Sequence, residues 1–233
     1  MRSDPDFVVS CEHASNAVPE ALRGLFAEDT EVMNTHRAYD PGALQAAQHM
    51  AEILGVAAHA ATVSRLVCDC NRSPGHPNLF SDVVHALSVQ EKNAILARFY
   101  WPYRHAVIDE ISNYHAAGRS VVHLSVHSFT PLLNGRTRTA DVGLLFDTAR
   151  EKERRLAHEI QRRLIAHIPG LTVRNNYPYR GTSDGMTSAL RRINSETRYL
   201  GLEIELNQKL WLEDRPRWME LVEAVSSATV EPK

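Results

Sequence analysis

Short hydrophobic runs alternate along the chain with longer segments of helical periodicity. Continuous apolar runs of about four to eight residues indicate buried strands, whereas apolar residues spaced three and four apart indicate amphipathic helices. The pattern predicts strands at 7–10, around 61–68, and at 120–127, 140–147, 171–176 and 199–206. It predicts helices at 42–54, 88–117, 148–167, 183–194 and 214–227. This alternation predicts one open α/β sheet with helices on both faces.

Local signals sharpen several helix ends. Gly55 follows the first predicted helix, and glycine is common just beyond a helix end. Ser88 and Glu91 have the spacing of a capping box. Pro102 is expected to break or kink the long helical segment in which it lies. The segment 183–194 is expected to be a capped helix.

Size and charge narrow the functional classes. The chain has 233 residues, of which 43% are hydrophobic, and this is enough for one substantial core. No repeat, low-complexity tract or linker is visible, so we expect a single domain over residues 1–233. The 26 basic and 28 acidic residues give a net charge of −2. A dedicated nucleic-acid binder would usually be strongly basic, so that class is not expected.

Location and redox state follow from the same composition. Charges interrupt the hydrophobic stretches, so no membrane-spanning helix is expected. The start of the chain, MRSDPDFVVS, has acids and a proline where a signal peptide needs a long apolar region, and a cytoplasmic location is therefore expected. The three cysteines, Cys11, Cys68 and Cys70, are odd in number, which predicts reduced, buried thiols rather than a disulfide framework.

Polar residues stand at four predicted strand ends, where packing does not require them. They are Glu12 and His13, then Asp69, Asn71 and Arg72, then His127 and Ser128, and finally Glu203 and Glu205. Strand ends of an open α/β sheet gather at one edge, where such proteins bind their ligands. Because burying an unpaired charge costs several kcal/mol, roughly, carboxylates inside strands need a reason.

A hydrolytic metal centre supplies that reason. Catalytic zinc typically has three His, Asp or Glu ligands and one open position for water. It lowers the pKa of that water to about 7 and polarises the scissile carbonyl, while a carboxylate outside the coordination shell moves the proton. An arginine with an asparagine can hold a substrate carboxylate. The residues alone therefore predict hydrolysis of an amide in a small acidic molecule.

Several of these residues also have ordinary structural explanations. His13 fits a partly buried histidine with satisfied hydrogen bonds, and Arg72 fits an ion pair with Asp69 or Asp82. Glu203 and Glu205 lie two apart, so the strand pattern places both on one face and does not choose between them.

A competing motif is GTSDG at 181–185, which matches the G-x-S-x-G nucleophile elbow. That elbow needs an apolar strand directly before it, whereas the preceding NNYPYR reads as a loop. A serine hydrolase using Ser183 or Ser128 with a histidine remains a weaker alternative. A non-catalytic domain that binds carboxylates is another.

Seven motifs occur along the chain in the same order as in one known protein family: SCEHASNAVPE, HRAYDPGA, SRLVCDCNRSP, VHSFTP, DVGLLFD, NYPYRG and GLEIELNQKLW. Together, over residues 8–212, they resemble the N-formylglutamate amidohydrolase family. That family is similar to zinc carboxypeptidases and aspartoacylase. The resemblance implies a phosphorylase/hydrolase-like fold, with three α/β/α layers around a mixed sheet. It also implies Zn²⁺, or another divalent metal, as the cofactor.

The resemblance assigns roles to several residues. His13 and His127 become metal ligands, and Asn71 with Arg72 becomes a carboxylate clamp. Glu205 becomes the general base and acid, because ELNQKLW matches the family pattern better from Glu205 than from Glu203.

The third metal ligand departs from the carboxypeptidase pattern. Carboxypeptidases have a glutamate three residues after the first histidine, where this chain has Asn16. Asp40 or Glu12 can stand in. Asp40 is preferred because it lies at the start of a helix in a turn stiffened by Pro41. In extended backbone Glu12 would point to the face opposite His13.

Loop residues complete the predicted site. Tyr179 and Arg180 are candidate substrate contacts, as are Arg136 and Arg138, although all can equally be solvated loop residues. The resemblance implies N-formyl-L-glutamate as substrate, with formate and glutamate as products. Another small N-acyl amino acid or a peptide remains an alternative, and so does the choice between Arg72 and Arg180 for the substrate carboxylate.

Overall fold

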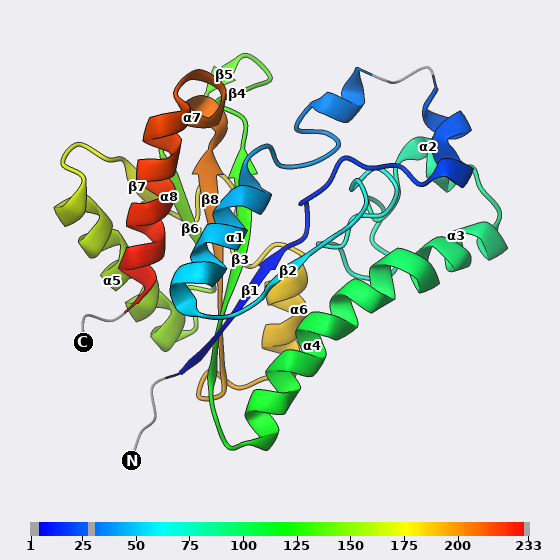
Figure 1. Ribbon diagram of the computed structural model, residues 1–233. Coiled ribbons are helices and arrows are strands. Elements are labelled where there is room, and N and C mark those ends of the chain that lie inside the picture. Colours follow the sequence, from blue (N-terminus) through cyan, green and yellow to red (C-terminus); the bar gives the residue numbers. More distant parts are fainter. Residues whose placement is uncertain (1–4, 28–30, 231–233) are drawn as a thin grey trace.

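A mixed six-stranded sheet forms the centre of the computed structural model, which describes residues 5–27 and 31–230 (Figure 1). The strand order is β2-β1-β3-β8-β6-β7. The strands are β1 (Asp6–Cys11), β2 (Ala58–Ala60), β3 (Val121–Phe129), β6 (Val142–Leu145), β7 (Val173–Asn175) and β8 (Tyr199–Asn207). Strands β2, β1, β3 and β8 run parallel, and β6 pairs antiparallel with β8 and parallel with β7.

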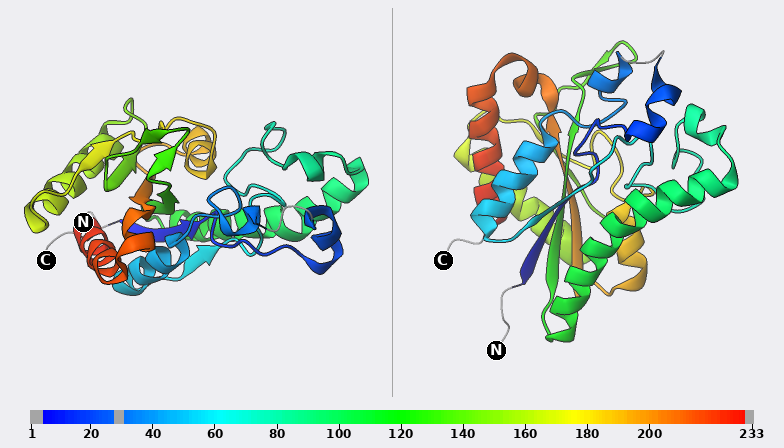
Figure 2. Two further views of the ribbon diagram at one scale, coloured as in Figure 1. Left: turned by 90° about the horizontal axis from the view of Figure 1, so that it is seen from above. Right: turned by 45° about the vertical axis from the view of Figure 1, so that its right-hand side comes forward.

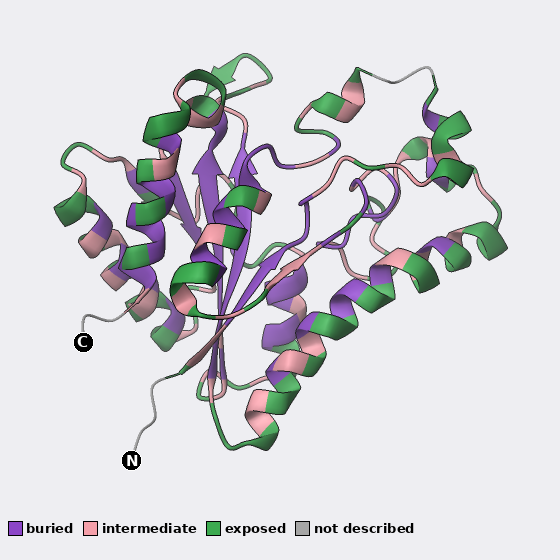
Figure 3. Ribbon diagram, viewed as in Figure 1, coloured by how far each residue is buried: buried purple, intermediate pink, exposed green. Residues whose placement is uncertain are grey.

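Helices cover both faces of this sheet (Figures 1 and 2). Helices α1 (Ala43–Leu54), α5 (Glu151–His167) and α8 (Arg215–Thr229) contribute to one apolar cluster, and α4 (Trp101–Ala116) and α6 (Met186–Ile193) to a second. The sheet is the most deeply buried layer (Figure 3). The predicted three-layer α/β/α architecture around a mixed sheet is confirmed.

Alternation along the central strands separates the two faces. On β8, Leu202, Ile204 and Leu206 belong to the cluster with α1, α5 and α8. Successive side chains of a strand point to opposite faces, so Glu203 and Glu205 point the other way. The carboxylates of β8 therefore lie on the face opposite this aliphatic core.

The strand predicted around 61–68 is wrong. The strand beside β1 is the shorter β2, and the chain then turns through Ser64. The Ser64 backbone N–H donates to the Ala17 carbonyl, and its hydroxyl donates to the Ala38 carbonyl. Val63 and Val67 are apolar because they lie buried in the cluster with α4 and α6. A buried loop thus produced the hydrophobic run.

The predicted long helical segment is divided. Helix α3 (Val89–Ile95) has the expected capping box of Ser88 and Glu91, and a π-helical turn (Leu96–Tyr100) joins it to α4. Pro102 lies in the first turn of α4. Proline lacks an N–H and crowds the carbonyl four residues earlier, and the wider turn ahead of it accommodates both.

Helix α6 begins with a cap that its own sequence does not supply. No side chain at its start bonds the first turn, contrary to the expected local cap. Instead Asn71 Oδ1 accepts the Met186 backbone N–H at 2.6 Å. Asp184 accepts from the Ser73 N–H and hydroxyl. The loop that carries Asn71 and the start of α6 are therefore fixed to each other.

Several short elements lacked a sequence signal because each is too brief to show a period. They are helical turns at Glu20–Phe26 and Val32–Asn34, helices α2 (Asp82–His85) and α7 (Gln208–Glu213), and strands β4 (Leu132–Leu133) and β5 (Arg136–Thr137). The three cysteines are buried and unpaired, as predicted. Among the described residues, no helix combines the length and apolar character needed to cross a membrane.

Gly42 offers a test of how tightly the start of α1 is fixed. Its φ is +84°, and a Cβ there would lie 2.6 Å from Trp218 Cζ2 and 2.8 Å from Trp211 Cε3. We expect Gly42→Ala to lower the free energy of unfolding by about 2–4 kcal/mol, since backbone strain and overpacking add. Urea unfolding measures this.

Two glycines serve as controls for that measurement. Gly170 has φ of +88° but open space, so Gly170→Ala should cost only the backbone strain, about 1 kcal/mol. Gly24 has open space and no positive φ, so Gly24→Ala should change stability by less than about 0.5 kcal/mol. Equal losses at Gly42 and Gly170 would contradict the packing explanation.

Candidate active site

A cavity of about 200 Å³ opens beside the carboxyl ends of the central strands. Most of the residues singled out from the sequence line it, and its polar walls include His13, Asp40, Arg65, Asn71, Arg72, His127, Ser128, Tyr179, Arg180, Ser183, Glu203 and Glu205. Segments far apart in the sequence therefore converge there. Arg136 and Arg138 are not among its lining residues.

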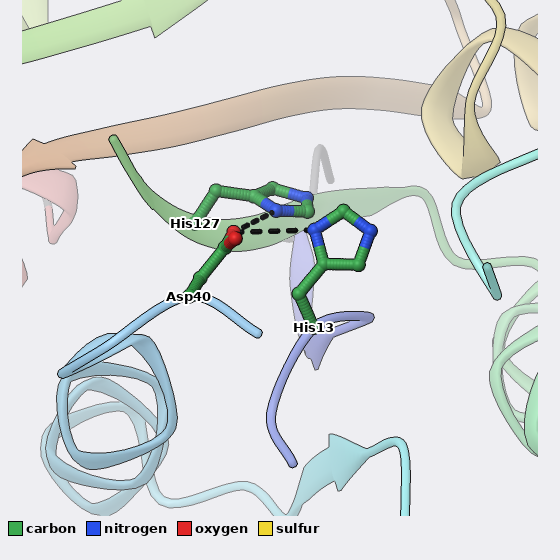
Figure 4. A group of neighbouring side chains, drawn as sticks. All are labelled: His13, Asp40 and His127. Carbon is green, nitrogen blue, oxygen red and sulfur yellow. Dashed lines mark hydrogen bonds and ion pairs between the residues drawn. The ribbon is translucent and has the colours of Figure 1, made fainter. Parts of the chain in front are cut away.

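Two imidazoles and one carboxylate meet in its wall (Figure 4). Asp40 Oδ2 lies 3.2 Å from His13 Nδ1 and 2.9 Å from His127 Nδ1. All three side chains are buried, and one donor atom from each lies within 4.8 Å of the others. His13 follows β1, Asp40 precedes α1 and His127 belongs to β3. The structure thus brings together the three residues predicted as metal ligands.

The far nitrogen of each imidazole faces another buried carboxylate. His13 Nε2 lies 2.8 Å from Asp69 Oδ1, and His127 Nε2 lies 3.1 Å from Glu12 Oε2. Glu12 therefore contacts His127 from the side away from Asp40. Metal-binding histidines commonly bond a carboxylate through the nitrogen that does not bind metal.

Glu12 reaches the same cluster as His13, contrary to the expectation for extended backbone. Strand β1 ends at Cys11, and the chain turns at Glu12 and His13 rather than continuing as extended backbone. Both side chains consequently reach the same cluster. His13 contacts Asp40 directly, whereas Glu12 contacts the far nitrogen of His127.

The charges of the cluster fit a divalent cation. Burial lowers the pKa of His127, but its hydrogen bonds to Asp40 and Glu12 outweigh this and raise the pKa well above the usual value. The pKa of His13 is also raised, because Asp69 and Asp40 outweigh burial and Arg65. The three carboxylates of Asp40, Asp69 and Glu12 need three positive charges for balance: Arg65 provides one, and two imidazolium protons or one divalent cation would provide the other two. One divalent cation can therefore replace two protons in this cluster. Imidazole and carboxylate groups are also suitable zinc ligands.

Glu205 differs from Glu203 in its surroundings. It pairs in register with His127 on the neighbouring strand. Its Oε2 is buried and, among the described residues, has no hydrogen-bond partner. Burial raises the pKa of Glu205 to about 7, with His127 opposing and Asp40 adding to the shift. Glu203 Oε1 instead accepts the Thr187 hydroxyl at 2.5 Å.

The predicted substrate contacts share the cavity wall. Arg72 Nη1 donates to the Asp184 carbonyl at 2.6 Å, whereas its buried Nε has no partner among residues 5–27 and 31–230. Asn71 is committed to α6 through its Oδ1. Arg180 lines the cavity beside Tyr179, which is 47% exposed.

The two serines lack a nucleophile's surroundings. The Ser128 hydroxyl donates to the Pro41 carbonyl and accepts from Gln208. Ser183 follows a loop rather than a strand, since β7 ends at Asn175. In the described part of the chain, no histidine hydrogen-bonds either serine.

Other polar residues at the site escaped sequence reasoning. Arg65 donates to Asp69 at 2.9 Å and lies 3.5 Å from Asp40, and His36 lines the cavity. Neither has a distinguishing local pattern. His123 and Ser125 did carry a signal, because with His127 they occupy alternate positions of an otherwise apolar strand.

The chain resembles known proteins over nearly its whole length. The N-formylglutamate amidohydrolase family matches residues 6–212. The chain belongs to this family. It is a hydrolase acting on amide bonds, and the predicted enzyme class is confirmed. A search of curated proteins finds no match.

Two crystal structures share the fold of this amidohydrolase. The gene product Atu2144 of Agrobacterium tumefaciens is 31% identical, with a TM-score of 0.80 over 96% of this chain and 90% of that one. N-formylglutamate amidohydrolase from Ralstonia eutropha JMP134 is 22% identical, with a TM-score of 0.68 over 97% of this chain and 91% of that one. At 22% identity the second supports the fold alone.

The raised pKa of Glu205 predicts a pH-dependent stability in metal-free protein. Between about pH 4.5 and 7 the folded state holds a proton that the unfolded state has lost, so stability falls as pH rises through this window. The loss is at most about 3 kcal/mol. Glu205→Gln lacks this titration, so the difference in unfolding free energy between wild type and variant should change with pH. A pH-independent difference in urea unfolding would show that Glu205 titrates normally.

Proposed function

We propose that this amidohydrolase is a zinc enzyme that cleaves N-formyl-L-glutamate to formate and glutamate. One observation carries the proposal: the donor atoms of His13, Asp40 and His127 lie within 4.8 Å of one another, beside a cavity that Glu205 also lines. Family membership supports the substrate class.

His13, Asp40 and His127 would hold the metal, with Asp69 and Glu12 fixing the two imidazoles. When bound, zinc supplies Lewis-acid polarisation of the carbonyl and lowers the pKa of water. Another divalent metal with similar ligand preferences would serve the same purpose.

Glu205 moves the proton. It takes a proton from the attacking water as oxygen adds to the formyl carbon. It then gives that proton to the amine nitrogen as the C–N bond breaks, so formate and glutamate leave. A pKa of about 7 suits both directions of transfer near neutral pH.

Two arginines in the cavity wall match a substrate with two carboxylates. The unpartnered Nε–H of Arg72 needs an acceptor, and a carboxylate offers a planar, charge-assisted one. Arg180 with Tyr179 supplies a second contact from the loop. The Asn71 backbone carbonyl accepts a hydrogen bond from Arg72 Nη1 at 3.3 Å.

Chelation tests the metal. Removing metal should abolish formate release from N-formyl-L-glutamate, and added zinc should restore it. His127→Ala should lose both stoichiometric zinc and activity, because one ligand is missing. Metal analysis and a formate assay over a panel of N-acyl amino acids measure these effects. Full activity in metal-free protein would overturn the proposal, and inactivation by a serine-directed reagent would favour the alternative.

Glu205→Gln separates proton transfer from metal binding. We expect zinc content to stay at the wild-type level while kcat falls at least about 100-fold, since general acid–base catalysis contributes about 10²–10⁴. Glu203→Gln is the matched control on the same strand and should retain more activity. If Glu203→Gln has the larger effect on kcat, the assignment of Glu205 is wrong.

A further inference from the structure

A row of buried polar side chains continues from the site into the interior, on the sheet face toward α4. It consists of Ser10, Glu12, Tyr103, His123, Ser125 and Tyr199, each at most 8% exposed. Buried polar groups are costly unless hydrogen-bonded, so each needs a partner. Of these residues only Glu12 has been given a role so far, as the carboxylate that fixes His127.

Glu12 is the centre of this row: it accepts three hydrogen bonds from hydroxyl groups and lies in ion-pair distance of His127. Its Oε1 accepts from the Ser10 hydroxyl at 2.7 Å and from the Tyr103 hydroxyl at 2.9 Å. Its Oε2 accepts from Ser125 at 2.7 Å and faces His127 Nε2 at 3.1 Å. With three hydroxyl donors and the His127 nitrogen around it, the carboxylate has no need of its own proton, and it is ionised.

The directions of the remaining bonds follow from the number of hydrogens. Ser10 has one hydroxyl hydrogen and gives it to Glu12, so His123 Nε2, 2.7 Å from Ser10 Oγ, must be the donor there. Burial lowers the pKa of His123 to about 4, so its ring is neutral with one N–H. His123 Nδ1 must then accept from the Tyr199 hydroxyl at 2.8 Å. Tyr199, His123, Ser10 and Glu12 thus form a continuous series of hydrogen bonds, here called the Glu12 chain. Each donor in the Glu12 chain donates in the direction of Glu12.

We propose that the Glu12 chain fixes the proton of His127 on Nε2, so that the Nδ1 lone pair faces the metal beside Asp40. Ser125 assists, because its hydroxyl donates to Glu12 and lies 3.0 Å from His127 Nε2. Nε2–H therefore meets two acceptors, Glu12 and Ser125, while Asn71 Nδ2 lies at the longer distance of 3.4 Å from the same nitrogen. Glu12, Ser10, His123 and Tyr199 are positioning residues in this arrangement, which rests on the metal centre of the proposed function.

The wrong tautomer would defeat metal binding. A neutral imidazole carries one N–H, and a hydrogen on Nδ1 removes the lone pair that would face the cation. An ionised acceptor beside Nε2 favours a hydrogen there more strongly than a neutral one does. Donors that converge on Glu12 keep it ionised and in place.

Zinc affinity, measured by chelator competition, tests the role of the Glu12 chain without an activity assay. Glu12→Gln keeps the shape but removes the charge, and it should weaken zinc binding by about 10–100-fold. Ser10→Ala should weaken it by a smaller factor, about 3–10-fold. In the Glu12→Gln background, Ser10→Ala should have no further effect, because Ser10 acts through Glu12. Ser226→Ala, a fully buried serine in α8, is the matched control and should leave the affinity unchanged.

Two spectroscopic measurements separate positioning from coordination. In zinc-loaded protein with ¹⁵N-labelled histidine, His127 should show N–H on Nε2 and metal on Nδ1. The cobalt-substituted spectra of wild type and Glu12→Gln should agree, because Glu12 is not a ligand. A changed cobalt spectrum, coordination through Nε2, or wild-type affinity in both Glu12→Gln and Ser10→Ala would overturn the proposal.

These outcomes are distinguishable from failure of the proposed function. Weakened zinc binding in the variants, with no formate release by wild type from any N-formyl amino acid, would reject the substrate and leave the Glu12 chain standing. Normal formate release, together with unchanged zinc affinity in the variants, would reject only the proposed role of the Glu12 chain. A wild type that binds no zinc would overturn both.

Discussion

The constraint on which the site depends is one carboxylate oxygen shared by two imidazoles. Asp40 Oδ2 faces Nδ1 of His13 and Nδ1 of His127, while Glu12 and Asp69 occupy the far nitrogens. Three buried carboxylates cannot lie this close without positive charge among them, because the desolvation cost of each is several kcal/mol, roughly. The cluster therefore requires protons or a cation, and it ties the end of β1, the turn before α1 and the middle of the sheet into one unit.

The sheet converts this electrostatic requirement into a rigid geometry. Ser10, Ser125 and Glu203 are register partners on β1, β3 and β8, and His127 pairs with Glu205 two residues further along. Because side chains alternate, the same strands give Leu202 and its aliphatic neighbours to the opposite core. Polar residues are thus held by backbone that is itself fixed by packing on the other face. A site built into central strands is more precise than one carried only by loops.

Much of the fold could be predicted from the sequence, because the strands near the site have strong local signals. The run at 120–127 is rich in β-branched residues, and it makes up most of β3. The run at 61–68 was wrongly predicted to be a strand, because a buried loop has the same apolar residues as a buried strand. The orientation of Glu12 could not be predicted, since it depends on where β1 stops pairing. Arg65 reaches Asp69 and Asp40 only through the tertiary fold, so no local pattern marks it.

The two glutamates of β8 show how environment, rather than residue type, separates chemical roles. Both face the cavity from one strand, two positions apart. Glu203 Oε1 accepts a hydrogen bond from the Thr187 hydroxyl. Glu205 has a buried oxygen without a donor, so its charged form is disfavoured and its pKa is raised to about 7. The missing hydrogen bond costs stability and at the same time gives a proton affinity suited to general base and acid chemistry. Identical side chains on one face of one strand therefore differ because their neighbours on α6 and β3 differ.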